Sequence, residues 1–122
     1  MSATHQLDAT PETCFWGYFD QSLAPALKVA PGDAVDVRAL THHAGDAPDL
    51  MMDDGVEAVW ASVPEGERGP GVHIMTGPIA IEGAVPGGVV SVTIESTAAR
   101  LPYGSTASAH WGALHELSLI HI

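Results

Sequence analysis

The sequence predicts a mainly β fold, with at most one short helix near residues 55–62. Three observations support this prediction. Runs of β-branched residues recur along the chain, residues 34–40 alternate apolar and polar side chains with the period of a half-buried strand, and 13 glycines and 9 prolines in 122 residues supply frequent turns. The expected strands cover residues 26–30, 34–42, 71–76, 78–82 and 88–97.

The first 20 residues contain one polar segment and one aromatic segment. Residues 1–14 have Leu7 as the large apolar side chain before Cys14, which favours an edge strand or an extended arm. Residues 15–20 then place four aromatic side chains around Gly17. This segment is either a core plug or the wall of a ligand pocket, and the core plug is favoured because aromatic side chains dominate buried area.

Two similar turn-and-strand units follow each other along the chain. Pro31-Gly32-Asp33 predicts a turn, and it precedes a strand whose inward residues are expected to be Val35, Val37 and Ala39. A similar sequence pattern recurs 55 positions later as Pro86-Gly87-Gly88, followed by a strand in which Val90, Val92 and Ile94 are expected to face inward. The second turn lacks a carboxylate at the position of Asp33, because Gly88 stands there.

Residues 55–63 are expected to form one or two helical turns that end at Pro64. In a helix this segment brings its large apolar side chains onto one face, namely Val56, Val59, Trp60 and Val63. Residues 65–71 then form a flexible approach to the next stretch. The preceding residues 41–54 hold two adjacent histidines and four aspartates, His42, His43, Asp46, Asp49, Asp53 and Asp54. A metal site there is disfavoured, because adjacent histidines on an extended chain point to opposite sides and carboxylate-rich loops are usually solvated.

The charge of the chain narrows the range of partners. Fifteen acidic residues against four basic ones give a net charge of -11, which repels phosphate backbones and anionic lipids. We therefore expect no nucleic-acid partner and no membrane partner. A single cysteine excludes an internal disulfide, and the amino terminus lacks the pattern of a signal peptide, so the expected location is the cytoplasm.

Residues 71–88 combine one imidazole with two strand-like apolar runs and with breakers at Gly77-Pro78 and Pro86-Gly87. His73 is therefore the candidate ligand residue, and the alternative is a core or turn histidine. Glu82 is a possible second ligand, but nine residues of straight strand at ~3.3 Å each place it about 30 Å from His73. Sharing one ion requires a reversal at Gly77-Pro78, so a solvent-facing glutamate at a strand end is favoured. Cys14 is a poor candidate nucleophile because no local signature of a base surrounds it.

The string His73-Ile74-Met75-Thr76-Gly77-Pro78-Ile79, followed by Glu82-Gly83-Ala84-Val85-Pro86-Gly87, resembles the amino-terminal part of the acetamidase/formamidase family. Residues 10–13 and 16–20 fit the same pattern, and the resemblance covers most of residues 9–116. Two positions depart from it: Phe15 stands where family members have a histidine, and Gly88 stands where they have an aspartate.

The resemblance implies a partial β-sandwich or barrel-like fold and a metal-dependent hydrolase that converts formamide or acetamide to the carboxylate and ammonia. It implies a divalent metal ion, with zinc expected, and His73 as a metal ligand. The other ligands lie beyond this chain in the family, so residues 1–116 are expected to be an incomplete amidase domain that is inactive alone and homo-oligomeric in the full-length protein. Catalytic and substrate-binding residues stay unassigned. The alternative is a non-enzymatic β-rich binding or interaction module.

Residues 117–122 are expected to be a non-native tail. The transposase end sequence used in library preparation, CTG TCT CTT ATA CAC ATC, encodes Leu-Ser-Leu-Ile-His-Ile, the last six residues of the chain. The alternative is a short apolar terminal strand.

Overall fold

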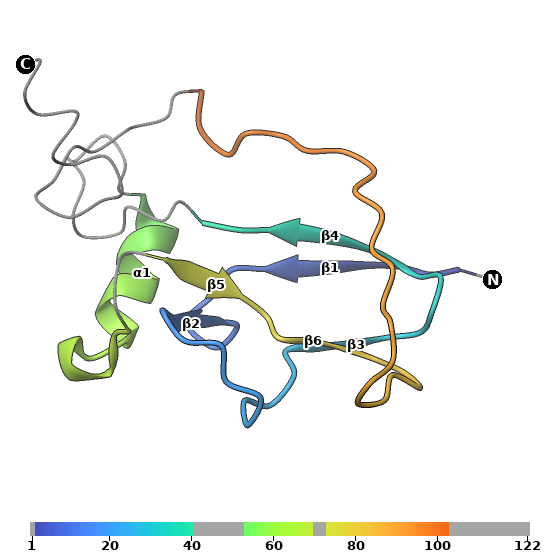
Figure 1. Cartoon of the computed structure of the whole chain (residues 1–122). Coiled ribbons are helices and arrows are strands. Elements are labelled where there is room, and N and C mark those ends of the chain that lie inside the picture. The colour runs from blue at the N-terminus through green and yellow to red at the C-terminus, as the bar shows by residue number, and fades with distance from the viewer. Residues whose placement is uncertain (1, 41–52, 70–72, 103–122) are drawn as a thin grey trace, which may run out of the picture.

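The computed structural model describes residues 2–40, 53–69 and 73–102 (Figure 1). These residues form mainly strands and one helix, which confirms the predicted fold class. The elements are β1 (Thr4–Asp8), β2 (Cys14–Trp16), β3 (Leu27–Val29), β4 (Ala34–Arg38), α1 (Asp54–Ser62), a 3-10 turn (Glu65–Glu67), β5 (Ile74–Thr76) and β6 (Ile79–Ile81). None of the helices in these ranges is long and apolar enough to cross a membrane.

The six strands form three two-stranded sheets that join distant parts of the sequence. β1 pairs with β4 in parallel, β2 pairs with β5 antiparallel, and β3 pairs with β6 in parallel. The chain passes from β1 to β2, from β3 to β4 and from β5 to β6, so each sheet is linked covalently to the others. β3, β4, β5 and β6 lie within the predicted strands at 26–30, 34–42, 71–76 and 78–82, of which residues 41–42 and 71–72 lie outside the described ranges. β1 confirms the edge strand expected in residues 1–14.

The turn before β4 is fixed by the carboxylate of Asp33. The backbone N–H of Asp33 donates to Ala30 O at 3.1 Å, and Gly32 adopts a φ of 91° that closes the turn. The Asp33 carboxylate accepts from Ala3 N at 2.8 Å and from Ala30 N at 3.1 Å, and His5 Nε2 lies 2.9 Å from Asp33 Oδ2. One side chain therefore joins the turn to the start of β1.

The same contacts give a pH-dependent contribution to stability. The N–H of Ala3, then the His5 side chain and the N–H of Ala30, lower the pKa of Asp33 from 3.8 to about 2. The native state therefore holds fewer protons than the unfolded chain between these values, so this contribution is complete above about pH 4 and is lost as the pH falls through about 2.

The free energy of unfolding, measured by urea titration, should decrease less between about pH 4 and about pH 2 in Asp33→Asn than in the unchanged protein, because the variant has no carboxylate at this position. Asp36→Asn, at an exposed position, should leave this decrease unchanged.

The second turn has the same backbone geometry, but no strand follows it. Gly88 N donates to Val85 O at 3.0 Å, and Gly87 adopts a φ of 84°, as Gly32 does in the first turn. The strand predicted over 88–97 is wrong, because residues 88–97 pair with no other segment in the described ranges. Their predicted inward side chains are exposed, and Val37 in β4 is exposed as well. Alternation marks the faces of a strand, but burial also requires a partner that covers one of them.

The main apolar cluster lies where α1 packs against β2. It contains the buried side chains of Trp16 and Val56, and the partly buried residues packed against them are Leu40, Trp60, Val63 and Ile74. Asp53 caps the helix, since its Oδ1 accepts from Gly55 N and Val56 N at 3.0 Å each. The predicted helix is confirmed, and its predicted apolar face is the one that contacts the core.

Arg68 closes this cluster from the side of the 3-10 turn. Its Nη2 donates to Trp60 O at 2.9 Å and its Nε donates to Val63 O at 3.0 Å, so it satisfies carbonyls at the end of α1. The guanidinium carbon lies 3.7 Å from the ring centroid of Trp60 and 5.2 Å from that of Trp16. The two indole rings meet edge to face at 5.6 Å.

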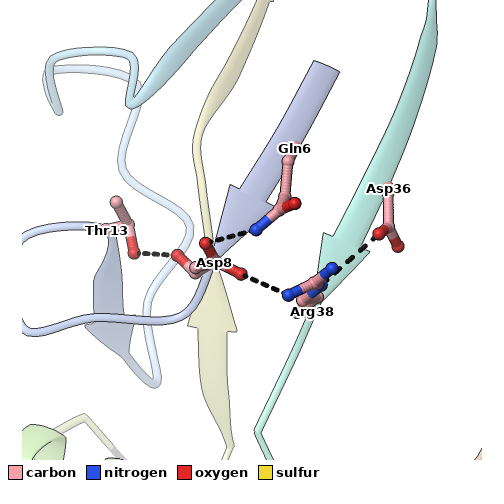
Figure 2. A network of polar contacts seen from close by, with 5 residues as sticks. All are labelled: Gln6, Asp8, Thr13, Asp36 and Arg38. Carbon is pink, nitrogen blue, oxygen red and sulfur yellow. Dashed lines mark hydrogen bonds and ion pairs between the residues drawn. The ribbon is translucent and has the colours of Figure 1, made fainter. Parts of the chain in front are cut away.

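Arg68→Leu should lower the free energy of unfolding by about 2 kcal/mol, because it removes two hydrogen bonds from a charged donor and a cation–π contact. Arg38→Leu is the matched control. Figure 2 shows Arg38 between Asp8 and Asp36 on the surface of the β1–β4 sheet, with ion-pair distances of 3.7 Å and 3.4 Å. Exposed pairs of this kind contribute at most about 1 kcal/mol. Equal losses in the two variants, measured by urea unfolding, would contradict this interpretation.

Candidate functional site

The candidate site is built around the segment from β5 to β6. β5 pairs with β2 in the register Trp16↔Ile74, and β6 pairs with β3 in the register Leu27↔Ile79. The Gly77–Pro78 peptide bond between them is cis. Gly77 N donates to Thr13 O at 2.8 Å, and Pro78 O accepts from Ala26 N at 2.8 Å. The backbone of the central motif is therefore held on both sides by earlier parts of the chain.

His73 directly precedes β5, and the residue is exposed. Its carbonyl accepts from Gly17 N at 3.1 Å, which extends the pairing of β5 with the segment after β2. The backbone at His73 is thus held by a hydrogen bond, and the residue as a whole is exposed. An exposed residue does not fit the core-histidine alternative, whereas a turn histidine and a ligand residue both fit this exposure.

A close contact between two glycines fixes the loop on the other side of His73. Gly69 N donates to Trp16 O at 3.2 Å. A Cβ placed on Gly69 would lie 2.7 Å from Gly17 Cα and 2.9 Å from Trp16 O, so only glycine fits at this position. Gly17 itself has a φ of 78°. The segment that leads from α1 toward His73 is therefore pressed against the end of β2.

Glu82 lies at the end of β6 and is paired elsewhere. Lys28 Nζ lies 3.3 Å from Glu82 Oε1, and both side chains are exposed. Figure 1 shows the chain running on from β5 to β6 without turning back, so the reversal needed to bring Glu82 to His73 does not occur. Glu82 is therefore a solvent-facing residue at the end of β6, in agreement with the alternative that the sequence favours.

No cluster of three or more potential metal ligands from His, Cys, Asp and Glu is found within residues 2–40, 53–69 and 73–102. His73 alone does not make a metal site, which needs three or four ligands. Of the histidines and aspartates in residues 41–54, Asp53 is used as a helix cap and binds Arg100, whose Nη2 lies 2.7 Å from Asp53 Oδ2. The residues at 42, 43, 46 and 49 lie outside the ranges that the structure describes.

The aromatic residues of segment 15–20 lie in two different environments, the core and an open depression on the surface. Trp16 is a core residue with 6% of its surface exposed, which agrees with the core plug. Its neighbours instead line a shallow, open depression next to the cis proline, formed by Phe15, Phe19, Asp20, Gln21 and Pro78. The sequence alone did not indicate that Asp20 and Gln21 line the same depression as Pro78, because this arrangement depends on the pairing of β3 with β6. The Asp20 carboxylate is held by the hydroxyl and N–H of Ser22, which lower its pKa.

Cys14 lies on β2, with its Sγ 3.8 Å from Thr76 Oγ1 on β5. Burial raises the pKa of the Cys14 thiol, which disfavours the thiolate that a nucleophile requires. Its position across from Thr76 is that of a cross-strand packing residue.

The fold and the site together define a mainly β chain whose central histidine stands at the start of a strand. No protein-family model matches this sequence, and a search of curated proteins finds no significant match.

Proposed function

We propose that residues 1–116 form the amino-terminal part of a metal-dependent hydrolase of short aliphatic amides, resembling the acetamidase/formamidase family. One observation carries the proposal. The string from His73 to Ile79, with Glu82-Gly83-Ala84 and Pro86-Gly87 after it, resembles the pattern of that family. The backbone at Gly77 and Pro78 in this string is held by hydrogen bonds to Thr13 and Ala26. A catalytic side chain requires this kind of fixed backbone.

His73 is the proposed metal ligand from this part of the chain. The residue is exposed, and its carbonyl is hydrogen-bonded to Gly17, so the backbone that carries the imidazole is held in place. When bound, a divalent ion such as zinc polarises the amide oxygen and makes a bound water more acidic. The other ligands would come from outside the ranges described here, and residues 1–116 alone are expected to be inactive.

The proposal also covers the surroundings of the site. The three strand pairs would be parts of a sandwich or barrel-like domain completed by further chain, and the full-length protein would be a cytoplasmic homo-oligomer. The depression beside Pro78, with aromatic walls and one carboxylate, has the mixture of apolar and polar groups that small-molecule sites use. We assign no substrate contact to it.

The test is ammonia release from formamide and acetamide by the full-length protein that contains residues 1–116, called the full-length amidase below. Turnover that depends on a bound divalent metal supports the proposal. A folded, full-length protein that releases no ammonia from either amide with added zinc would refute it.

A second candidate function is a non-enzymatic β-rich interaction module. It is favoured by the exposed apolar side chains after Gly88, which include Val89 and Val92. Ammonia release distinguishes the two candidates, because a pure interaction module has no turnover with amides.

A further inference from the structure

A single peptide group, the one between Trp16 and Gly17, is bonded to both ends of the segment that leads to His73. Its C=O accepts from Gly69 N at 3.2 Å, and its N–H donates to His73 O at 3.1 Å. The C=O and N–H of a trans peptide group point to opposite sides, so this group lies between residue 69 and residue 73. Both ends of residues 69–73 are therefore held at one point, at the end of β2.

Arg68 links this peptide group to the end of α1. Its guanidinium carbon lies 5.2 Å from the ring centroid of Trp16, which is within the ~6 Å range of a cation–π contact. The same guanidinium donates to the carbonyls of Trp60 and Val63. Arg68 also directly precedes Gly69, whose N–H donates to Trp16 O. Trp16 is thus held by the side chain of residue 68 and by the backbone of the residue that follows it.

We propose that Arg68 is a positioning residue for His73. It holds the Trp16 ring close to the start of residues 69–73, and this keeps the Trp16–Gly17 peptide group within reach of both of its partners. The backbone that carries the imidazole is fixed as a result. The inference rests on the proposed function, because His73 needs a fixed backbone only if it binds a metal ion. Groups that orient a metal ligand change the metal affinity without touching the metal themselves.

The competing interpretation is that Arg68 only stabilises the packing of α1 against β2. A loss of global stability speeds the exchange of all amide hydrogens that open by global unfolding, and it does so by the same factor. Release of the Trp16–Gly17 peptide group instead acts on two particular donors, the N–H groups of Gly17 and Gly69. Hydrogen exchange at single amides therefore distinguishes the two interpretations.

The first measurement is hydrogen exchange of the full-length amidase without metal, read at single amides by mass spectrometry. Arg68→Leu should speed exchange at Gly17 and Gly69 at least ~10-fold more than at Glu82. The N–H of Glu82 donates to Val29 O at 2.9 Å in the β3–β6 sheet, away from α1 (Figure 1). Equal factors at the three amides would overturn the proposal.

Val59→Ala is the matched control for a loss of stability. Val59 is fully buried in α1 and does not belong to the apolar cluster around Trp16. Its truncation should speed exchange at the three amides by about the same factor. Arg68→Lys is a milder variant, which keeps the positive charge and loses the planar set of donors. It should give the pattern of Arg68→Leu with smaller changes, so the test does not depend on one variant that folds poorly.

The second measurement is the zinc affinity of the full-length amidase, by competition with a chromophoric chelator. Arg68→Leu should weaken zinc binding at least ~10-fold, and Val59→Ala should leave it unchanged. An unchanged affinity in Arg68→Leu would overturn the positioning role and leave the proposed function standing. A full-length amidase that binds no zinc even without substitution would refute the proposed function, and with it the role of Arg68 toward a metal ligand.

Discussion

His73→Ala is expected to lower the turnover of formamide by the full-length amidase at least ~100-fold, because the change removes a proposed metal ligand. The secondary structure should stay intact, since the hydrogen bond from Gly17 N to the carbonyl of residue 73 is a backbone contact that alanine keeps. Ammonia release and metal content, measured on the same preparation, give the result.

His5→Ala is the matched control for the loss of a histidine. His5 lies on β1 and is paired with Asp33, so its loss should affect stability and leave turnover per folded molecule unchanged. If His73→Ala keeps both its activity and its metal, His73 is a structural residue and the proposed ligand role is wrong.

Gly69→Ala is expected to destabilise the chain by about 2–3 kcal/mol, the range of overpacked positions. The added Cβ would lie 2.7 Å and 2.8 Å from the Cα and carbonyl carbon of Gly17. These atoms belong to the backbone, so the loop must move away from β2. That movement breaks the bond from Gly69 N to Trp16 O, and it disturbs Gly17, whose N–H is bonded to the carbonyl of His73.

Gly66→Ala is the control for this change. Gly66 belongs to the neighbouring 3-10 turn, and a Cβ there has no atom within 4 Å. Its effect on the free energy of unfolding should stay within about 0.5 kcal/mol. Urea titrations of both variants provide the measurement, and a Gly69→Ala chain as stable as Gly66→Ala would show that the two glycines are not in tight contact.

The parts of the fold that follow from local pattern were predictable from the sequence. The helix was found because Val56, Val59 and Trp60 repeat at helical spacing and Pro64 ends the run. The turns at Gly32 and Gly87 were found because a proline precedes a glycine that supplies the positive φ. These signals depend on neighbours in the chain, so no knowledge of tertiary contacts was needed.

The parts that depend on distant contacts were not predictable. Residues 88–97 have the same alternation as β4, yet β4 has β1 beside it and residues 88–97 have no partner in the part of the chain that the structure describes. β2 was missed as a strand because its three residues form one only through pairing with β5. The position of Arg68 against two tryptophans likewise required the fold, since Trp16 is 52 positions away.

The same distinction applies to the site. The motif from His73 to Ile79 was visible in the sequence, whereas the backbone bonds from Thr13, Gly17 and Ala26 that hold it were not. Residues 117–122, proposed as a non-native tail, lie outside the described ranges.

The proposed metal-dependent amidase activity can be measured as ammonia release from formamide by the full-length amidase, with zinc bound and after removal of the metal by a chelator. We expect turnover in the metal-bound protein, loss of turnover after chelation and recovery when zinc is returned. A well-folded protein that binds no metal and releases no ammonia from formamide or acetamide would contradict the proposed activity.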